Sequence, residues 1–151
     1  MSRFEEATGE PYEIVNGLIG EHFPELSGAK FEIVFDTKKR KSAGRIVFAR
    51  IQSTNDLAKY FTADQENPDG VDYILYIDKN LWNNITSEDK KRLIYHELCH
   101  CDVDLDKKKP FGIKDHDIQM FESEINYNND DPRWTLRLAS FLDDFYEQQK
   151  E

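Results

Sequence analysis

The most informative stretch of the sequence starts at Thr86-Ser87-Glu88-Asp89 and ends at His96-Glu97-Leu98-Cys99-His100. Its start is typical of a helix N-terminus, because a Thr or Ser side chain caps the first N–H groups and acids lie near the positive end of the helix dipole. Leu93 and Leu98 continue the apolar spacing of a helix. We therefore predict a helix that runs from Thr86 to about Val103.

Two histidines and a glutamate give this helix its chemistry. His96 and His100 are four residues apart, and a helix turns once in about 3.6 residues, so both imidazoles leave the same side. In this H-E-x-x-H spacing two histidines bind one Zn²⁺, and the glutamate faces a water molecule. A metal lowers the pKa of its bound water to ~7, so Glu97 is the predicted general base. Imidazole ligands favour zinc among the available metals.

A catalytic zinc site needs a third protein ligand. The chain has four histidines, and His116 is the first candidate because a loop with Pro110 and Gly112 lets the chain fold back. Glu122 and Glu124 are the alternatives, since a glutamate from the following helix would complete a His₂Glu site. We interpret the remaining histidine, His22, as structural.

The rest of the chain predicts a helix, then strands, then helices. This order indicates an α+β fold rather than a regular βαβ alternation. We expect the first two strands to form a hairpin, because a basic turn that contains glycine joins them. The expected helices are Pro11 to about Phe23, Thr54–Phe61 (capped by Ser53 or Thr54), His116 or Asp117 to about Tyr127, and Pro132 to about Gln148; the expected strands are Phe31–Phe35, Arg45–Ile51 and Val71–Ile77; and the expected loop is Asp104–Asp115.

Composition excludes several classes of protein. The chain has 151 residues and a formal net charge of -10, which argues against direct binding to nucleic acid or to an anionic membrane. No apolar run approaches the ~20 residues that span a bilayer, and the first residues lack the apolar core of a secretory signal. The two cysteines, Cys99 and Cys101, are too close for an unstrained disulfide, so we expect reduced thiols and a cytoplasmic protein.

Two blocks of the sequence carry a resemblance. The block Tyr95-His96-Glu97-Leu98-Cys99-His100 is followed, after a loop, by Asp115-His116-Asp117-Ile118-Gln119-Met120-Phe121. Together they resemble the phage metallopeptidases and, more distantly, the SprT-like zinc proteases. The resemblance covers roughly residues 12 to 135. Action on DNA is not implied, since the chain has neither a CxxC pair nor a basic tail.

The resemblance implies a minimal zincin-like domain over residues 1–151, with a small three-stranded sheet packed against an active-site helix and C-terminal helices. It implies that His96, His100 and His116 bind zinc and that Glu97 is the general base.

The first hypothesis for function is therefore a zinc-dependent peptidase in the cytoplasm of a bacterial host. Its substrate would be a protein or peptide. Tyr95 and Tyr127 are candidates, by their chemistry only, for stabilising the oxyanion.

Two other functions stay open. One is an acidic phage-type binding or inhibitor protein in which the metal is structural. A protein of this class could imitate DNA with its acidic surface, but the sequence argues against this, because basic residues interrupt the acidic ones at Lys38–Lys41 and Lys107–Lys109. The other is metal-assisted hydrolysis of a bond other than a peptide.

Overall fold

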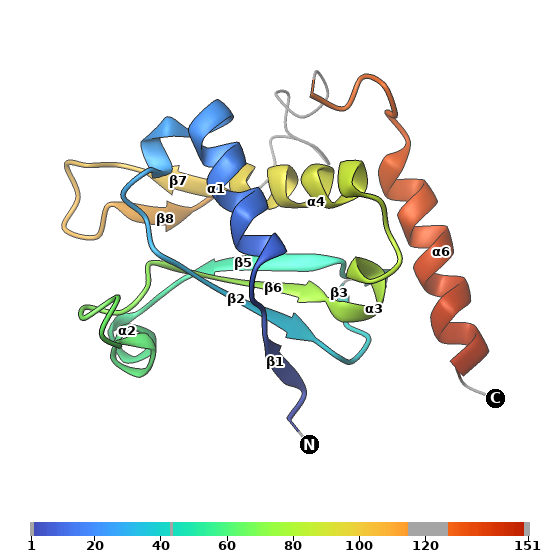
Figure 1. Cartoon of the computed structure of the whole chain (residues 1–151), viewed down its shortest axis with the longest axis horizontal. Coiled ribbons are helices and arrows are strands. Elements are labelled where there is room, and N and C mark those ends of the chain that lie inside the picture. Colours follow the sequence, from blue (N-terminus) through green and yellow to red (C-terminus); the bar gives the residue numbers. More distant parts are fainter. Residues whose placement is uncertain (1, 43, 115–126, 150–151) are drawn as a thin grey trace.

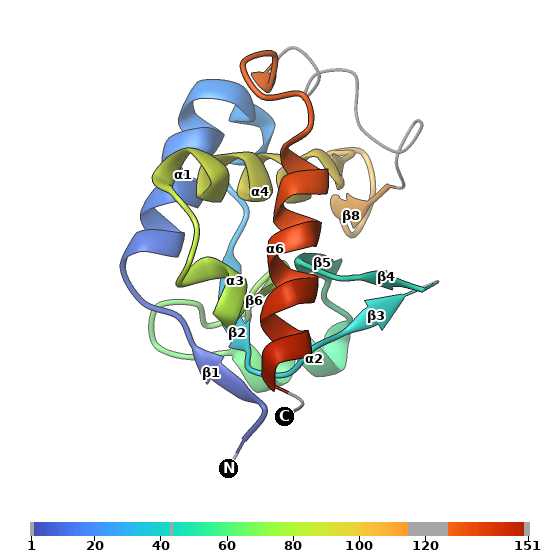
Figure 2. The same cartoon turned by 90° about the vertical axis from the view of Figure 1, so that its right-hand side faces the viewer.

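The computed structural model describes residues 2–42, 44–114 and 127–149. It confirms the α+β class: helices α1 and α4 lie over one face of a sheet, and α6 runs along one end of it (Figure 1, Figure 2). The described elements are β1 (Phe4–Glu6), α1 (Glu10–His22), a 3₁₀ turn (Pro24–Leu26), β2 (Phe31–Asp36), β3 (Lys41–Ser42), β4 (Arg45–Ile46), β5 (Ala49–Ser53), α2 (Asp56–Thr62), β6 (Tyr73–Asp78), α3 (Lys79–Trp82), α4 (Ser87–Cys99), β7 (Cys101–Val103), β8 (Phe111–Ile113) and α6 (Trp134–Gln149).

The central strand of the sheet is β6. It pairs in parallel with β2 on one side and antiparallel with β5 on the other. Five of its six residues are buried, as expected for the central strand of a sheet. The predicted hairpin of Phe31–Phe35 with Arg45–Ile51 is therefore wrong, because β6 lies between the two strands. The second of them is also interrupted: Arg45–Ile46 pairs with Lys41–Ser42 in a small separate hairpin.

The main sheet has four strands in the order β1-β2-β6-β5, one more than predicted. The additional strand, β1, pairs antiparallel with β2 at the edge of the sheet. Its three residues, Phe4–Glu6, are all exposed, so they lack the alternation that marks a half-buried strand. An ion pair beside it, Arg3 Nε to Asp36 Oδ1 at 2.7 Å, ties this end of the chain to β2.

Three predicted helices are confirmed in their main extent. α1 has Pro11 in its first turn and buries an apolar stripe against α4 and the sheet. α2 begins two residues later than expected, at Asp56, and its cap is Asn55 rather than Ser53 or Thr54: the Asn55 side chain accepts from the N–H of Ala58 at 2.8 Å. α6 buries Trp134, Leu138, Leu142 and Tyr146, at the four-residue spacing of one helix face.

α4 starts as predicted but ends early. The Thr86 hydroxyl accepts from the N–H of Asp89 at 3.2 Å and so caps the helix. The helix stops at Cys99, and the prediction that it reaches Val103 is wrong. Cys101–Val103 instead forms β7, which pairs with β8. Pairing with the next strand along the chain outcompetes the helix here, and the predicted loop Asp104–Asp115 therefore contains the strand Phe111–Ile113.

The helix predicted from His116 or Asp117 to about Tyr127 falls almost wholly outside the described residues. Among the helices that are described, none is both long enough and apolar enough to cross a membrane.

Candidate metal centre

The last turn of α4 brings the two histidines together. The ring centroids of His96 and His100 are 5.3 Å apart, so both imidazoles leave the same side of the helix, as the spacing predicts. His96 lies within the helix and His100 caps its C-terminus, with its N–H donating to the Glu97 carbonyl at 3.1 Å. Both histidines are half-buried, and Glu97 between them is only 6% exposed.

A backbone carbonyl orients His100. Nδ1 of His100 lies 2.7 Å from the carbonyl oxygen of Lys114. Because a carbonyl only accepts, Nδ1 carries the proton in this contact, which leaves Nε2 with the lone pair that a metal needs. The N–H of Lys114 in turn donates to the His100 carbonyl at 2.7 Å. These two bonds close the β7–β8 hairpin and hold the chain at Lys114 against the histidine.

Beside the histidines the surface is hollowed. The hollow has a volume of about 570 Å³, within the range of ~300–1,000 Å³ that is usual for ligand sites. One wall is the segment from β4 to β5, the next is the last part of α4, and the third is the start of α6. The lining residues are Ser42, Arg45, Ile46, Val47, Phe48, Ala49, Arg50, Ile51, Leu93, His96, Glu97, His100, Ile113, Trp134 and Thr135.

Trp134 forms part of this wall and is 1% exposed. Its ring lies 6.5 Å from that of His96, at 66°. An apolar ring against an imidazole restricts the positions that the imidazole can take. The indole Nε1 of Trp134 has no hydrogen-bond partner in the described part of the chain. The place of Trp134 beside His96 could not be predicted from the sequence, because no local signal marks a contact between helices so far apart in the chain.

A buried ion-pair network holds the first turn of α4 to α6. Asp89 is 2% exposed, and its carboxylate accepts from Arg137 at 2.7 Å through both oxygens and from Arg92 at 2.6 Å. The hydrogen bonds from Arg137, and next those from Arg92, hold the pKa of Asp89 below its usual range. The network fixes α4 relative to Trp134 and hence fixes two walls of the hollow.

The two cysteines are buried thiols. Cys101 lies on β7, not on α4, and burial raises its pKa far above the usual value. The Tyr73 hydroxyl beside it donates to the Gly112 carbonyl at 2.9 Å. Cys101 does not line the hollow beside the histidines.

His22 lies in an aromatic cluster, in agreement with its interpretation as structural. Its ring meets those of Tyr95 and Tyr127 edge-on, at 5.4 and 5.3 Å. The two tyrosine rings stack on each other at 4.1 Å. Neither tyrosine lines the hollow, so the structure gives no support to Tyr95 or Tyr127 as the group that stabilises an oxyanion.

The predicted third ligand is not placed. His116 and its alternatives, Glu122 and Glu124, lie outside the described residues. Within residues 2–42, 44–114 and 127–149, no group of three or more His, Cys, Asp or Glu side chains is arranged to hold a metal ion. The described part of the site therefore consists of two imidazoles and one carboxylate beside a hollow. Nitrogen donors of this kind suit zinc, so the residues present fit the metal that the motif predicts.

Comparison with known proteins gives one match. A family model with the description "Putative phage metallopeptidase" matches residues 2–146, nearly the whole chain. No curated protein and no solved structure matches the chain.

Proposed function

Because the chain belongs to the phage metallopeptidase family, we propose that it is a zinc-dependent peptidase, with His96, His100 and His116 as metal ligands and Glu97 as the general base. The whole chain, residues 1–151, acts in this proposal as one zincin-like domain. Its substrate is a protein or peptide.

One observation carries the proposal. Two imidazoles 5.3 Å apart flank a buried glutamate, and all three side chains line the same hollow. Polar groups of this kind are costly to bury unless they are hydrogen-bonded, paired or bound to a metal. The 2.7 Å contact of His100 Nδ1 with a carbonyl is the type of orienting bond that metal-binding histidines usually make.

The β7–β8 hairpin supports His116 as the third ligand. Two reciprocal bonds hold Lys114 against His100, and His116 follows two residues later. Two residues of extended chain span at most about 7 Å, so the short chain between Lys114 and His116 is compatible with this ligand set. Glu122 and Glu124 are farther along the chain, so a longer stretch of chain would have to fold back to bring either glutamate to the histidines.

The chemistry then divides between the metal and the chain. Zinc bound by the three histidines supplies a Lewis acid toward the scissile carbonyl and toward a water molecule. Glu97 takes the proton from the attacking water and passes it to the leaving amine. Trp134 and residues 49–51 of β5 line the hollow that would receive the peptide.

Elemental analysis of the purified protein tests the ligand set. We expect about one zinc per chain in the wild type and a large loss of zinc in His116→Ala. Glu122→Gln and Glu124→Gln are the matched variants, and both should keep the metal. Zinc retained in His116→Ala and lost in one of the glutamine variants would move the third ligand to that glutamate. No zinc in the wild type, even after zinc is supplied, would overturn the proposal.

A further inference from the structure

Helix α2 turns its apolar side chains outward. Leu57, Tyr60 and Phe61 are 63%, 75% and 73% exposed, and α2 buries no residue at all. A surface helix normally buries its apolar face and exposes its polar one. In α2 the order is reversed, since the spacing of these three residues puts them on one side of the helix, in contact with solvent.

Polar contacts hold the helix in this orientation. The Thr62 hydroxyl accepts from the N–H of Val71 at 3.0 Å, and Lys59 Nζ pairs with Asp72 at 3.0 Å. Gly70 has φ +82°, and a Cβ built there would lie 2.1 Å from the Lys59 carbonyl oxygen. The backbones thus pack directly on each other, and α2 cannot rotate its apolar side inward without breaking these contacts.

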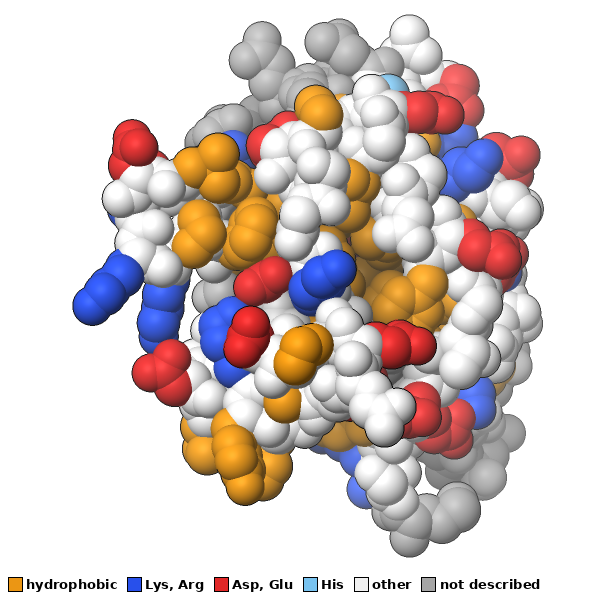
Figure 3. Space-filling view, turned by 60° about the vertical axis from the view of Figure 1, so that its left-hand side comes forward, with side chains coloured by type: hydrophobic (Ala, Val, Ile, Leu, Met, Phe, Trp, Pro, Cys, Tyr) orange, Lys and Arg blue, Asp and Glu red, His pale blue; other side chains and the backbone are white. Residues whose placement is uncertain are grey.

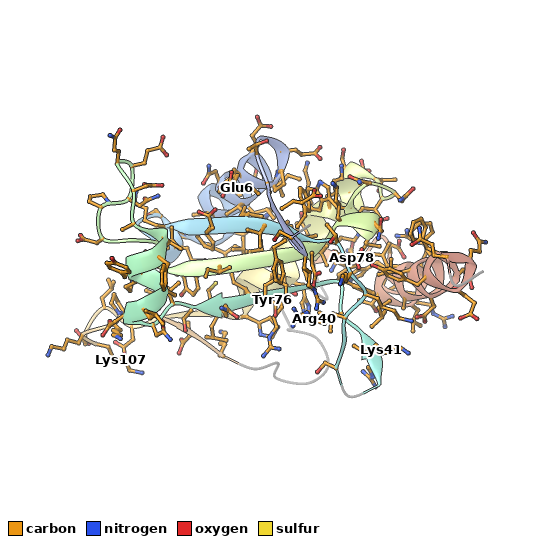
Figure 4. The ribbon with its side chains drawn as sticks, turned by 90° about the horizontal axis from the view of Figure 1, so that it is seen from below. Glu6, Arg40, Lys41, Tyr76, Asp78 and Lys107 are labelled. Carbon is orange, nitrogen blue, oxygen red and sulfur yellow. The ribbon has the colours of Figure 1, made fainter. Side chains whose placement is uncertain are left out.

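Charges of opposite sign flank the apolar side. The loop after α2 exposes Glu66 and Asp69, and the tip of the β7–β8 hairpin exposes Lys107 and Lys108. Figure 4 shows α2 between this loop and the hairpin that carries Lys107, and the ion pair of Lys109 with Asp56 at 3.0 Å joins the hairpin to α2. In Figure 3, orange side chains protrude below the projecting hairpin with its blue side chains.

We name as the α2 surface the apolar residues Leu57, Tyr60 and Phe61 with Glu66 and Asp69 on one side and Lys107 and Lys108 on the other. These four charged residues form no ion pair with any other described residue, and so their charges remain open to a partner.

We propose that the α2 surface binds the same surface of a second copy of this chain, about a two-fold axis. A two-fold interface places each patch against itself in reverse orientation. The apolar side of α2 then meets its own copy, and the lysines of each chain face the acids of the other. The alternating charge makes the surface complementary to itself.

Other occupants fit less well. An anionic membrane would attract the lysines but would meet Glu66, Asp69 and the formal net charge of -10. A partner of uniformly acidic or basic charge would face like charges on one side of α2. Only a partner with the same alternation satisfies both sides, and the chain itself has it.

Sedimentation velocity over a concentration series tests the dimer. We expect the mass to rise from that of one chain to that of two as the concentration increases. The double variant Tyr60→Ser/Phe61→Ser should weaken association by tenfold or more. Leu136→Ser is the matched control, because Leu136 is 67% exposed on α6 and lies outside the α2 surface. A chain that stays monomeric at all concentrations, or a dimer that Tyr60→Ser/Phe61→Ser leaves unchanged, would overturn the proposal.

Charge reversal tests the two-fold geometry. Lys107→Glu/Lys108→Glu puts acid against acid in a self-pair, and Glu66→Lys/Asp69→Lys puts base against base. We expect each variant alone to associate at least tenfold more weakly, and an equimolar mixture of the two to regain the wild-type mass. Failure of the mixture to associate would exclude this pairing, and circular dichroism checks that both variants are folded. The test measures association alone, so its outcome is independent of peptidase activity.

Discussion

The first and last turns of α4 both carry ionisable side chains, but in opposite settings. At the first turn Asp89 is buried against Arg92 and Arg137, and the charges neutralise one another. At the last turn His96, Glu97 and His100 line a hollow that a second molecule can enter. The difference shows how one helix combines two tasks: ion pairs at one end fix its position against α6, and the other end presents polar groups to an outside molecule.

The largest effect is expected at the last turn. Glu97→Gln should lower peptide cleavage by ~10²–10⁴-fold or more, because glutamine cannot take the proton of the attacking water. Zinc content should not change. The matched variant is Glu88→Gln, which alters an exposed glutamate in the first turn of the same helix and should leave cleavage intact. Equal turnover in Glu97→Gln and wild type would refute the role of Glu97.

The next effect concerns stability and the first turn. Asp89→Ala leaves the charges of Arg92 and Arg137 without their buried partner, and removal of one partner from such a pair costs about 3–5 kcal/mol. Arg137 is half exposed, so we expect the lower end of that range. Urea unfolding measures it, with Glu88→Ala as the control that should change stability by at most ~0.5 kcal/mol. A loss below 1 kcal/mol for Asp89→Ala would show that the network does not hold α4.

The same carboxylate gives a pH dependence. Hydrogen bonds from Arg137 and Arg92 lower the pKa of Asp89 from its ordinary 3.8, so the folded state favours the ionised form. Its contribution to stability is complete above the ordinary pKa and is lost as the pH falls through the lowered pKa of the folded state. The free energy of unfolding, measured from neutral to strongly acidic pH, should therefore fall more steeply below about pH 4 in the wild type. In Asp89→Asn this steeper fall of the unfolding free energy below about pH 4 should be absent.

The smallest effect is expected one residue along the helix. Lys90 Nζ lies 2.6 Å from Glu10 Oε1 and links α4 to α1 at the surface. Exposed pairs of this kind contribute about 0.2–1 kcal/mol, so Glu10→Gln should cost less than 1 kcal/mol in urea unfolding. If Glu10→Gln lowered the free energy of unfolding as much as Asp89→Ala does, burial would not explain the difference in strength between the two ion pairs.

Much of the candidate site could be predicted from the sequence. The cap at Thr86, the helix that follows and the common side of His96 and His100 all depend on residues within a few positions of one another. The orienting contact of His100 with the Lys114 carbonyl could not be predicted, because it depends on the pairing of β7 with β8. The place of Trp134 beside His96 depends on how α6 packs, for which the sequence has no local signal. The third ligand stays a prediction.

The fold divides in the same way. Helices α1 and α6 follow from apolar residues at helical spacing, and both are confirmed. The hairpin of Phe31–Phe35 with Arg45–Ile51 is wrong because nearness along the chain suggested a pairing that β6 takes instead. β6 is the most apolar strand, and at the centre of the sheet five of its six residues are buried. Burial of that strand, not the length of the connections, decides the order of the sheet.

The sequence by itself determined the α+β class, the helix that carries His96, Glu97 and His100, and the family to which the chain belongs. Helical hydrogen bonds and side-chain neighbours join residues three or four positions apart, so a short stretch of sequence contains what it needs to specify them. Only the tertiary structure decided the strand order, the end of α4 at Cys99, the Asp89–Arg137 pair and the hollow beside the histidines. The strand order, the Asp89–Arg137 pair and the hollow depend on contacts between segments far apart in the chain, whereas the end of α4 depends on the pairing of β7 with β8 directly after it. The shared burial of apolar surface selects among the possible contacts.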